Sequence, residues 1–169
     1  MTEPLDHGLG RSRGGFSSKI HLVCDGKGNP LGAVISGGQR NDSAFFEQAL
    51  RSVSIIQEHG RPKTRPQSVM ADKGYDFRSV RTCLRKRNIT AVIPQRKMPE
   101  TWRCHKRGPK PKTNMKLYKE RNVIERLIGW LKYCRRIATR FEKYATTFLA
   151  MVRLAFIKFY LKKYFSDIT

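Results

Sequence analysis

Two carboxylates could do metal chemistry in this chain. The stretch NVIERLIGWLK, residues 122–132, places Glu125 in a basic segment that has the periodicity of a helix. A second acid, Asp72, ends the short apolar run SVMAD, which is typical of a buried strand. An acid at a strand end and an acid on a covering helix can converge on one hard cation, because Mg²⁺ prefers one or two carboxylates with water and phosphate as its other ligands. The pair therefore predicts a metal site.

Four residues share one face of the helix that we expect over residues 114–137. At 100° per residue, Tyr118, Arg121, Glu125 and Lys132 fall within an arc of about 60°, and apolar residues occupy the opposite side. A solvated face with an ion pair between the arginine and the glutamate, worth about 0.2–0.5 kcal/mol, explains the same pattern without a function. The metal site therefore depends on the second acid, at the strand end.

The charge of the chain indicates its class of partner. The formal net charge is +22, from 35 Lys and Arg against 13 Asp and Glu. Such an excess favours a nucleic acid, with an anionic membrane surface as the alternative. A membrane span is not expected, because Arg153 and Lys158 interrupt the apolar C-terminal stretch, and the first residues lack the pattern of a signal peptide. Four cysteines without Cys-x-x-Cys spacing argue against zinc and for free thiols in a reducing cytosol.

Hydrophobic periodicity and turn residues predict an α/β chain with a mixed sheet and helices on its faces. Residues 1–15 are expected to form a leading loop that ends in GRSRGG. The expected elements are an antiparallel hairpin over 16–25 and 31–38, a helix over 43–60 capped by Asn41 or Asp42, a strand over 68–72, a helix over 77–88 capped by Asp76, a strand over 89–94, and helices over 114–137 and 143–164.

Two side-chain patterns within these elements have simple structural interpretations. His21 alternates within the first predicted strand, and we expect it to face solvent. An apolar stripe recurs at helical spacing near the C-terminus, and we expect it to pack in the core, with a dimer contact as the alternative; it comprises Phe148, Met151, Val152, Ala155, Phe156 and Phe159.

Several stretches resemble the DDE-type transposases of bacterial insertion sequences. The spacing Tyr118-x2-Arg121-x3-Glu125-x6-Lys132 matches the signature around the glutamate of that family. The stretches LGRSRGGFSSKIHLVCDGKGNPL, MADKGYD and RRIATRFEKYATTFLAMVRLAFI also resemble its catalytic domain. The resemblance implies an RNase H-like fold in which three acids hold two Mg²⁺ (or Mn²⁺) ions, with Asp72 as the second acid and Glu125 as the third.

The same resemblance implies DNA transposition by two-metal phosphoryl transfer, in which strands are cut and joined at insertion-sequence ends. Asp72 and Glu125 would be the catalytic and metal-binding residues. Arg121 and Lys132 would hold DNA phosphates, and Tyr118 would stack on a base or sugar, with a buried tyrosine that packs the helix as the alternative. Further DNA contacts are expected from GRSRGG and from the basic loop 95–113, whose alternative is a spacer; these contacts are Arg11, Arg13, Lys106 and Arg107.

The first catalytic aspartate of the family precedes the segment that corresponds to GRSRGG, and we expect this chain to lack it together with the central first strand. Residues 1–169 would then be a single domain, the C-terminal part of an RNase H-like catalytic domain. The expected partners are insertion-sequence ends, target DNA, an upstream transposase half and further copies in a homo-oligomer on DNA, without a membrane. The expected location is the bacterial cytoplasm, in association with the nucleoid. The alternatives are an inactive DNA-binding remnant of a transposase and a basic structural nucleic-acid-binding protein.

Overall fold

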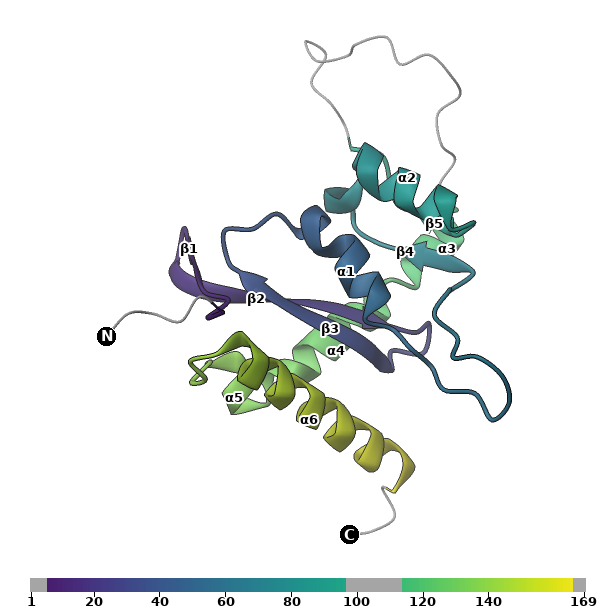
Figure 1. Ribbon diagram of the computed structural model, residues 1–169. Helices are drawn as coiled ribbons and strands as arrows, with labels where there is room; N and C mark the ends of the chain where they lie inside the picture. The colour runs from purple at the N-terminus through teal and green to yellow at the C-terminus, as the bar shows by residue number, and fades with distance from the viewer. Residues whose placement is uncertain (1–5, 97–113, 166–169) are drawn as a thin grey trace, which may run out of the picture. The chain divides into compact units, whose positions relative to one another are not determined.

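The structure is a computed structural model that describes residues 6–96 and 114–165 (Figure 1). It contains two compact units. Unit 1 comprises Met1–Thr64 and Asn122–Thr169, and unit 2 comprises Arg65–Arg121. Unit 1 contains a three-stranded antiparallel sheet, and unit 2 contains two parallel strands, each with helices around it. The predicted mixed α/β class is confirmed, with the described strands divided between two sheets.

The sheet of unit 1 has the order β1-β2-β3, with β1 at Gly10–Ser12, β2 at Gly15–Cys24 and β3 at Pro30–Gly37. The predicted hairpin of β2 and β3 is confirmed. Its turn is closed by Asp25, whose carboxylate accepts hydrogen bonds from the backbone N–H of Lys27 (2.8 Å) and Asn29 (2.9 Å). Gly28 has a φ of +83° in this turn, a conformation that favours glycine.

The prediction of a leading loop over residues 1–15 is wrong for the GRSRGG segment. Gly10 pairs with Ser17, and Ser12 pairs with Gly15, so β1 extends the sheet as a short hairpin. The turn is tight because Gly15 has a φ of +104° and its carbonyl oxygen accepts a hydrogen bond from Ser12 Oγ (2.9 Å). This strand forms because its residues pair with β2, and the local amino-acid composition does not encode that pairing.

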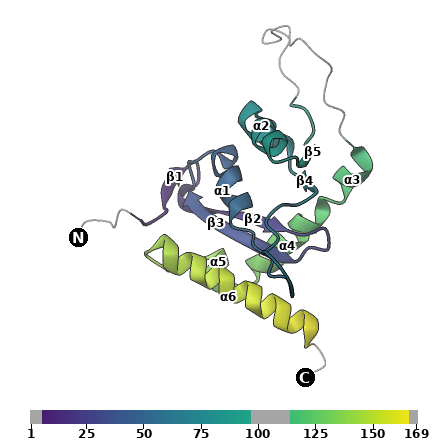
Figure 2. The ribbon, with the colours of Figure 1, turned by 45° about the vertical axis from the view of Figure 1, so that its right-hand side comes forward.

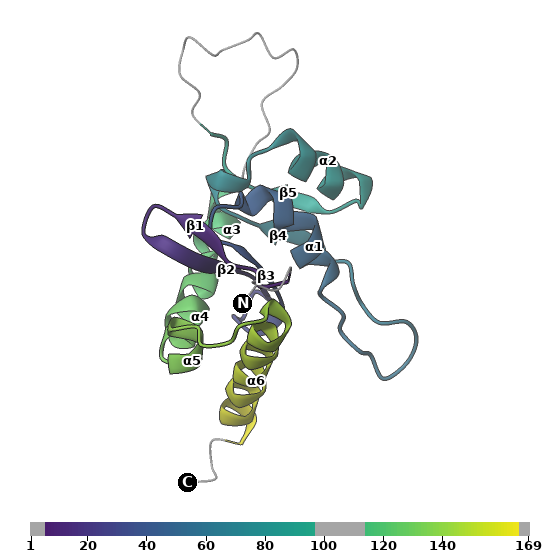
Figure 3. The same ribbon diagram turned by 60° about the vertical axis from the view of Figure 1, so that its left-hand side comes forward.

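The two faces of the unit 1 sheet are covered by different helices (Figures 2 and 3). Alternate residues of β2 point to opposite faces. Leu22 packs against Leu127 of α4 (Asn122–Lys132) and Ala155 of α6 (Ala145–Tyr164), whereas His21 stacks on Phe45, next to α1 (Phe46–Arg51). Helix α1 therefore covers one face, and α4 and α6 cover the other.

His21 does not face solvent, so that prediction is wrong. Its side chain is buried, with a ring nitrogen 2.8 Å from Ser36 Oγ and a ring centroid 4.9 Å from that of Phe45. Alternation placed His21 on the correct face, but helix α1 and the short helix η1 (Asp42–Phe45) cover that face. Burial lowers the pKa of His21, because the charged ring would lose its hydration, and this effect exceeds the opposing attraction of Asp42.

Acid should destabilise the protein through His21. Because its folded-state pKa lies below the unfolded value of about 6.5, the unfolded chain binds the proton first as the pH falls. The stabilisation is fully present above about pH 6.5 and is lost below it. Chemical denaturation at pH 7.5 and 5.0 should show a smaller pH-dependent loss for His21→Gln than for the unmodified chain. The exposed His59→Gln variant is the control, and an equal loss in all three proteins would contradict the assignment.

The predicted helix over residues 43–60 is much shorter in the structure. Asn41 caps η1 as expected, accepting from the backbone N–H of Ser43 (3.1 Å), but α1 ends at Arg51. Ser52 Oγ donates back to the carbonyl oxygen of Ala49 (2.7 Å), a local bond that competes with helix continuation. The chain beyond is extended at Ile55, which forms an antiparallel bridge with Lys63.

Unit 2 is built on the parallel strands β4 (Ser68–Met70) and β5 (Thr90–Val92), joined through η2 (Lys73–Tyr75) and α2 (Arg78–Lys86). The strands and the helix agree with the sequence prediction to within three residues at each end. The buried residues of this unit lie on one face of α2 and on the second strand with its flanks; they are Val80, Leu84, Ile89, Val92 and Ile93. A further helix, α3 (Met115–Lys119), completes the described part of the unit.

The single helix predicted over residues 114–137 is wrong, because the chain forms three helices there, α3, α4 and α5 (Arg135–Ala138). The backbone N–H groups of Glu120 and Arg121 bond three residues back, to the carbonyls of Leu117 and Tyr118. Such tight turns end an α-helix. The arc that joined all four signature residues assumed one continuous helix, so it does not hold across this break.

Helix α6 confirms the element predicted over residues 143–164 and its core-facing stripe. Phe148, Val152 and Ala155 are buried at spacings of four and three residues. The end of α6 is anchored to the β2–β3 turn, because the Tyr160 hydroxyl donates to the carbonyl oxygen of Pro30 (2.8 Å) and Lys163 Nζ donates to Asn29 Oδ1. In the described ranges, no helix is long and apolar enough to cross a membrane.

Candidate active site

Asp72 lies just beyond the carboxyl end of β4, where α/β folds commonly place ligand chemistry. The strand pairing reaches this point, because the Ala71 N–H bonds to the carbonyl oxygen of Val92 (3.4 Å). Asp72 is then the capping residue of η2, and its Oδ1 accepts from the Lys73 N–H (2.6 Å). The side chain is exposed, so the sheet edge holds the residue in place while leaving the carboxylate open to a ligand.

Two further signature residues lie beside Asp72 in unit 2. The Tyr118 hydroxyl is 3.5 Å from Asp72 Oδ1, and the guanidinium carbon of Arg121 lies 5.5 Å from the centroid of the Tyr118 ring. The first contact is a long hydrogen bond, and the second is within the range of a cation–π interaction. Tyr118 is half-buried. The structure thus brings together three residues that the sequence singled out, although Asp72 and Tyr118 are 46 positions apart in the chain.

Asp76 has a different role from the predicted helix cap, and that prediction is wrong. No side chain caps α2, whose capping position is Phe77. Asp76 instead forms an ion pair with Arg81 Nε (2.6 Å) and accepts from the Arg96 N–H (2.8 Å). Arg81 also donates to the carbonyl oxygen of Ile93 (2.8 Å). These bonds tie α2 to the chain after β5, so Asp76 is a structural acid four residues from the candidate catalytic one.

Glu125 and Lys132 lie on α4 in unit 1. They are seven residues apart in one helix, which places them about 20° from each other around its axis. Both side chains are exposed, whereas Leu127 and Leu131 are buried against the sheet. Glu125 stands in the first turn, where the helix dipole favours a negative charge. Glu125 and Lys132 therefore lie on the outer side of α4, about two helical turns apart, and their role in a site stays a prediction.

Gly129 lies between Glu125 and Lys132 along this outer face. A Cβ added to Gly129 would meet nothing within 4 Å, so the residue is not required by packing. We expect Gly129→Ala to raise the free energy of unfolding by about 0.5–1 kcal/mol, because alanine loses less backbone entropy in a helix. Urea denaturation measures the change. The contrasting variant is Gly32→Ala, whose added Cβ would lie 2.4 Å from Ser52 Oγ and should destabilise the protein.

The candidate metal ligands are the carboxylates of Asp72 and Glu125. Carboxylate oxygens are the donors that Mg²⁺ and Mn²⁺ prefer, so the chemistry of this pair fits those ions. Within the described ranges, no three or more His, Cys, Asp or Glu side chains form a group that could hold a metal ion. The two acids belong to different units, and their convergence on one metal stays a prediction.

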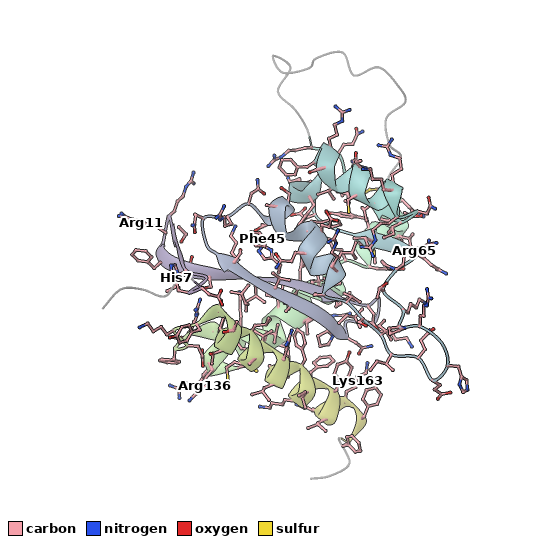
Figure 4. The ribbon with its side chains drawn as sticks, in the orientation of Figure 1. His7, Arg11, Phe45, Arg65, Arg136 and Lys163 are labelled. Atoms are coloured by element: carbon pink, nitrogen blue, oxygen red, sulfur yellow. The ribbon has the colours of Figure 1, made fainter. Side chains whose placement is uncertain are left out.

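The other predicted DNA contacts fall on two segments. Arg11 and Arg13 are exposed on the β1–β2 hairpin, and Figure 4 shows the Arg11 side chain extending away from the body of unit 1. Lys106 and Arg107 lie outside the described residues, as does the basic loop 95–113 beyond residue 96.

Sequence reasoning missed Arg81, the ion-pair partner of Asp76. Its separation of five residues from Asp76, across the start of a helix, is a signal that could have identified the pair.

Comparison with known proteins gives the family. The family model for the transposase DDE domain matches residues 3–158 of this chain. A transposase for insertion sequence element IS402 of Burkholderia cepacia is 36% identical over 138 residues, which cover 81% of this chain and 59% of that protein. A transposase for element IS6501 of Brucella ovis is 32% identical over 147 residues, 87% of this chain and 100% of that protein.

The chain therefore spans somewhat more than half of the Burkholderia relative and the full length of the Brucella one. No solved structure matches the chain. The mixed α/β architecture is consistent with the RNase H-like fold that the sequence resemblance implied. On the extent of the domain match and on these identities, the chain belongs to the family of transposases that carry a DDE domain.

Proposed function

We propose that this chain provides the second and third acids of a DDE active site that cuts and joins DNA strands at insertion-sequence ends. The observation that carries the proposal is the cluster of Asp72, Tyr118 and Arg121 at the carboxyl edge of β4. The sequence singled out Asp72 as an acid at a strand end, and Tyr118 and Arg121 as part of the signature around Glu125. Their side chains lie next to one another, with the Asp72 carboxylate exposed. The outer face of α4 adds Glu125, with Lys132 about two turns further along the same face.

Each residue has a physical task in this proposal. Asp72 and Glu125 would hold Mg²⁺ or Mn²⁺, which supplies activation of the attacking oxygen and stabilisation of the leaving oxygen when it is bound. The Tyr118 hydroxyl orients the Asp72 carboxylate, and the Tyr118 ring positions the guanidinium of Arg121. Arg121 and Lys132 bind DNA phosphates beside the scissile bond, because a cation there attracts the DNA backbone. Tyr118 thus positions other groups, whereas the sequence suggested base stacking.

The partners follow from the same proposal. We infer that residues 1–169 form the C-terminal part of one catalytic domain, which works with an upstream transposase half and as a homo-oligomer on element ends and target DNA. A further segment of the transposase is supported by the Burkholderia relative, because this chain covers only 59% of that protein. The high positive charge supports DNA as the ligand and the bacterial nucleoid as the location.

The test joins residues 1–169 to the upstream half of a related transposase and follows strand transfer of labelled element-end DNA with Mg²⁺. We expect Glu125→Gln to remove strand transfer while leaving DNA binding intact, and Glu120→Gln, an exposed acid in the preceding turn, to have no effect. Equal activity of the fusion and its Glu125→Gln variant would refute the catalytic assignment.

Two further outcomes separate the alternatives. Salt-dependent DNA binding by a fusion that never transfers strands would favour an inactive remnant. Cleavage of element-end DNA by residues 1–169 alone would show that the prediction of an absent first acid is wrong.

A further inference from the structure

A pocket of about 530 Å³ lies in unit 1, and none of the residues of the proposed active site lines it. One wall comes from β2 and from Leu9, the residue before β1. The other wall comes from residues 137–143, which are the end of α5 and its connection to α6. In Figure 4, Arg11 on the hairpin and Arg136 on α5 lie above and below His7, on the same side of unit 1. The volume is within the range of about 300–1,000 Å³ that is typical of small-molecule sites.

The lining of the pocket combines exposed aromatic rings with an apolar floor. Phe16 on β2 and Phe141 in the α5–α6 connection both line it, and they are 77% and 71% exposed. Phe148, which is 2% exposed, forms part of the floor. Two phenylalanines left in water at the border of one pocket gain nothing for folding, because their apolar surface is not removed from solvent. Their arrangement fits a flat ligand that stacks on one or both rings.

The charges around the pocket are positive. Arg11 stands directly opposite Phe16 in the β1–β2 register, so the two side chains are neighbours on one face of the hairpin. Lys143 lines the pocket and is exposed. The single acid among the lining residues that the structure describes, Glu142, accepts from Arg136 (3.4 Å) and from the Phe141 N–H (3.3 Å). An anionic ligand in this pocket would therefore be close to Arg11 and Lys143. The negative charge of Glu142 is already paired with Arg136.

Arg140 adds a fixed positive charge to the floor without offering it a free hydrogen-bond donor. Its guanidinium carbon lies 5.1 Å from the centroid of the Phe148 ring. All five of its N–H groups are used by protein acceptors, which are the carbonyl oxygens of His7, Gly8, Glu142 and Lys143 and the hydroxyl of Ser18. The floor attracts a polyanion electrostatically, while recognition is left to the stacking rings and the cations at the border.

We propose that this pocket binds an unstacked nucleotide of a DNA strand, with Phe16 and Phe141 as the stacking rings and Arg11 and Lys143 as phosphate contacts. This inference depends on the proposed function for the class of ligand but places it at a separate site. Single-stranded DNA is favoured because its bases expose their faces, whereas the bases of a duplex are already stacked. A second copy of the chain is a poorer occupant, because it would bring the same cations, from a chain of net charge +22, against this patch.

The experiment measures the affinity of the full 169-residue chain for a fluorescein-labelled oligothymidylate and for a duplex of equal length, by anisotropy in EDTA. Phe16→Leu and Phe141→Leu should each weaken oligothymidylate binding about 5- to 140-fold, since a stacked base contributes about 1–3 kcal/mol and 1.4 kcal/mol is tenfold. Duplex binding should change less than twofold. The dependence on salt should be unchanged, because no charge is removed.

Phe165→Leu is the matched control, because Phe165 is a comparably exposed phenylalanine that follows the far end of α6. It should bind both DNAs like the unmodified chain. Photocrosslinking with 5-iodouracil in the oligonucleotide should label peptides that contain residue 16 or 141. Unchanged oligothymidylate affinity in both pocket variants would overturn the proposal, as would an equal loss for single strand and duplex.

Sedimentation velocity tests the remaining alternative, in which a second copy of the chain occupies the pocket. If the pocket variants turn an oligomer into a monomer and keep their affinity for oligothymidylate, the rings form a protein contact and the proposal is wrong. The assay contains no divalent metal, so a failure of strand transfer in the Asp72 or Glu125 variants leaves its result interpretable.

Discussion

Asp72→Asn should reduce Mg²⁺-dependent strand transfer by the complete transposase at least about 100-fold, the scale of loss when one group of an electrostatic catalytic site is removed. The substitution should change the free energy of unfolding by less than about 0.5 kcal/mol, as is usual for an exposed side chain. Asparagine keeps an Oδ1 that can accept from the Lys73 N–H, so the cap of η2 survives. Only the negative charge, which a metal requires, is lost.

The matched variant is Asp76→Asn, four residues away on the same loop. The Asp76 and Arg81 side chains are 17% and 20% exposed, and their ion pair connects α2 with the end of β5 through Ile93. Removing one charge leaves the other poorly solvated, so we expect a loss of about 1–3 kcal/mol of stability. Strand transfer, measured where the variant is still folded, should fall far less than in Asp72→Asn.

Both variants are measured in the fusion by urea denaturation, by DNA anisotropy and by strand transfer with Mg²⁺ and Mn²⁺. A loss of activity without a loss of stability in Asp72→Asn, and the reverse in Asp76→Asn, would separate the catalytic acid from the structural one. Equal destabilisation by the two substitutions would mean that Asp72 is also part of the scaffold.

Arg140→Ala should lower the free energy of unfolding by about 2–3 kcal/mol, the largest stability effect that we expect from a single side chain outside the apolar core. The guanidinium joins the α5–α6 connection to distant parts of the chain, since it donates to the N-terminal segment and to β2. It also donates to the carbonyl oxygens of Glu142 and Lys143, just before α6. Hydrogen bonds from a charged donor contribute about 1.5–3 kcal/mol each when buried. Because Arg140 is partly exposed, water replaces some of them, and the total is well below their sum.

Arg140→Lys is the control for charge. Lysine keeps the cation but has three donors on one atom, so it cannot reach acceptors spread around a planar guanidinium. We expect it to recover less than half of the loss. Hydrogen exchange gives a local measurement, because the Ala145 N–H bonds to the carbonyl oxygen of Asp6 (3.0 Å) beside the guanidinium. Exchange of Ala145 should accelerate in both variants, and unchanged exchange would contradict a clamp on the N-terminal segment.

Elements with a strong hydrophobic periodicity and clear turn residues were predictable from the sequence. The β2–β3 hairpin alternates and has a turn rich in glycine and asparagine, and α6 repeats its apolar residues every three or four positions over 20 residues. The helix breaks after Arg51 and Lys119 were not predictable, because the residues there are compatible with a helix. The Ser52 hydroxyl and two turns that bond three residues back end those helices.

The residue types of the candidate site, and their spacing, were determined by the sequence: scarce acids at a strand end and on a helix, and cations at fixed distances from them. Which acid remains open was decided by the tertiary structure. Asp72 and Asp76 follow the same strand four residues apart, and the local pattern assigned Asp76 to a helix cap that the structure does not show. Packing brings Arg81 and the Arg96 N–H onto Asp76 and the Tyr118 hydroxyl near Asp72, so one carboxylate is neutralised in the scaffold while the other faces solvent. The same packing buried His21 on a face that alternation alone had left to water, because covering helices come from distant parts of the chain.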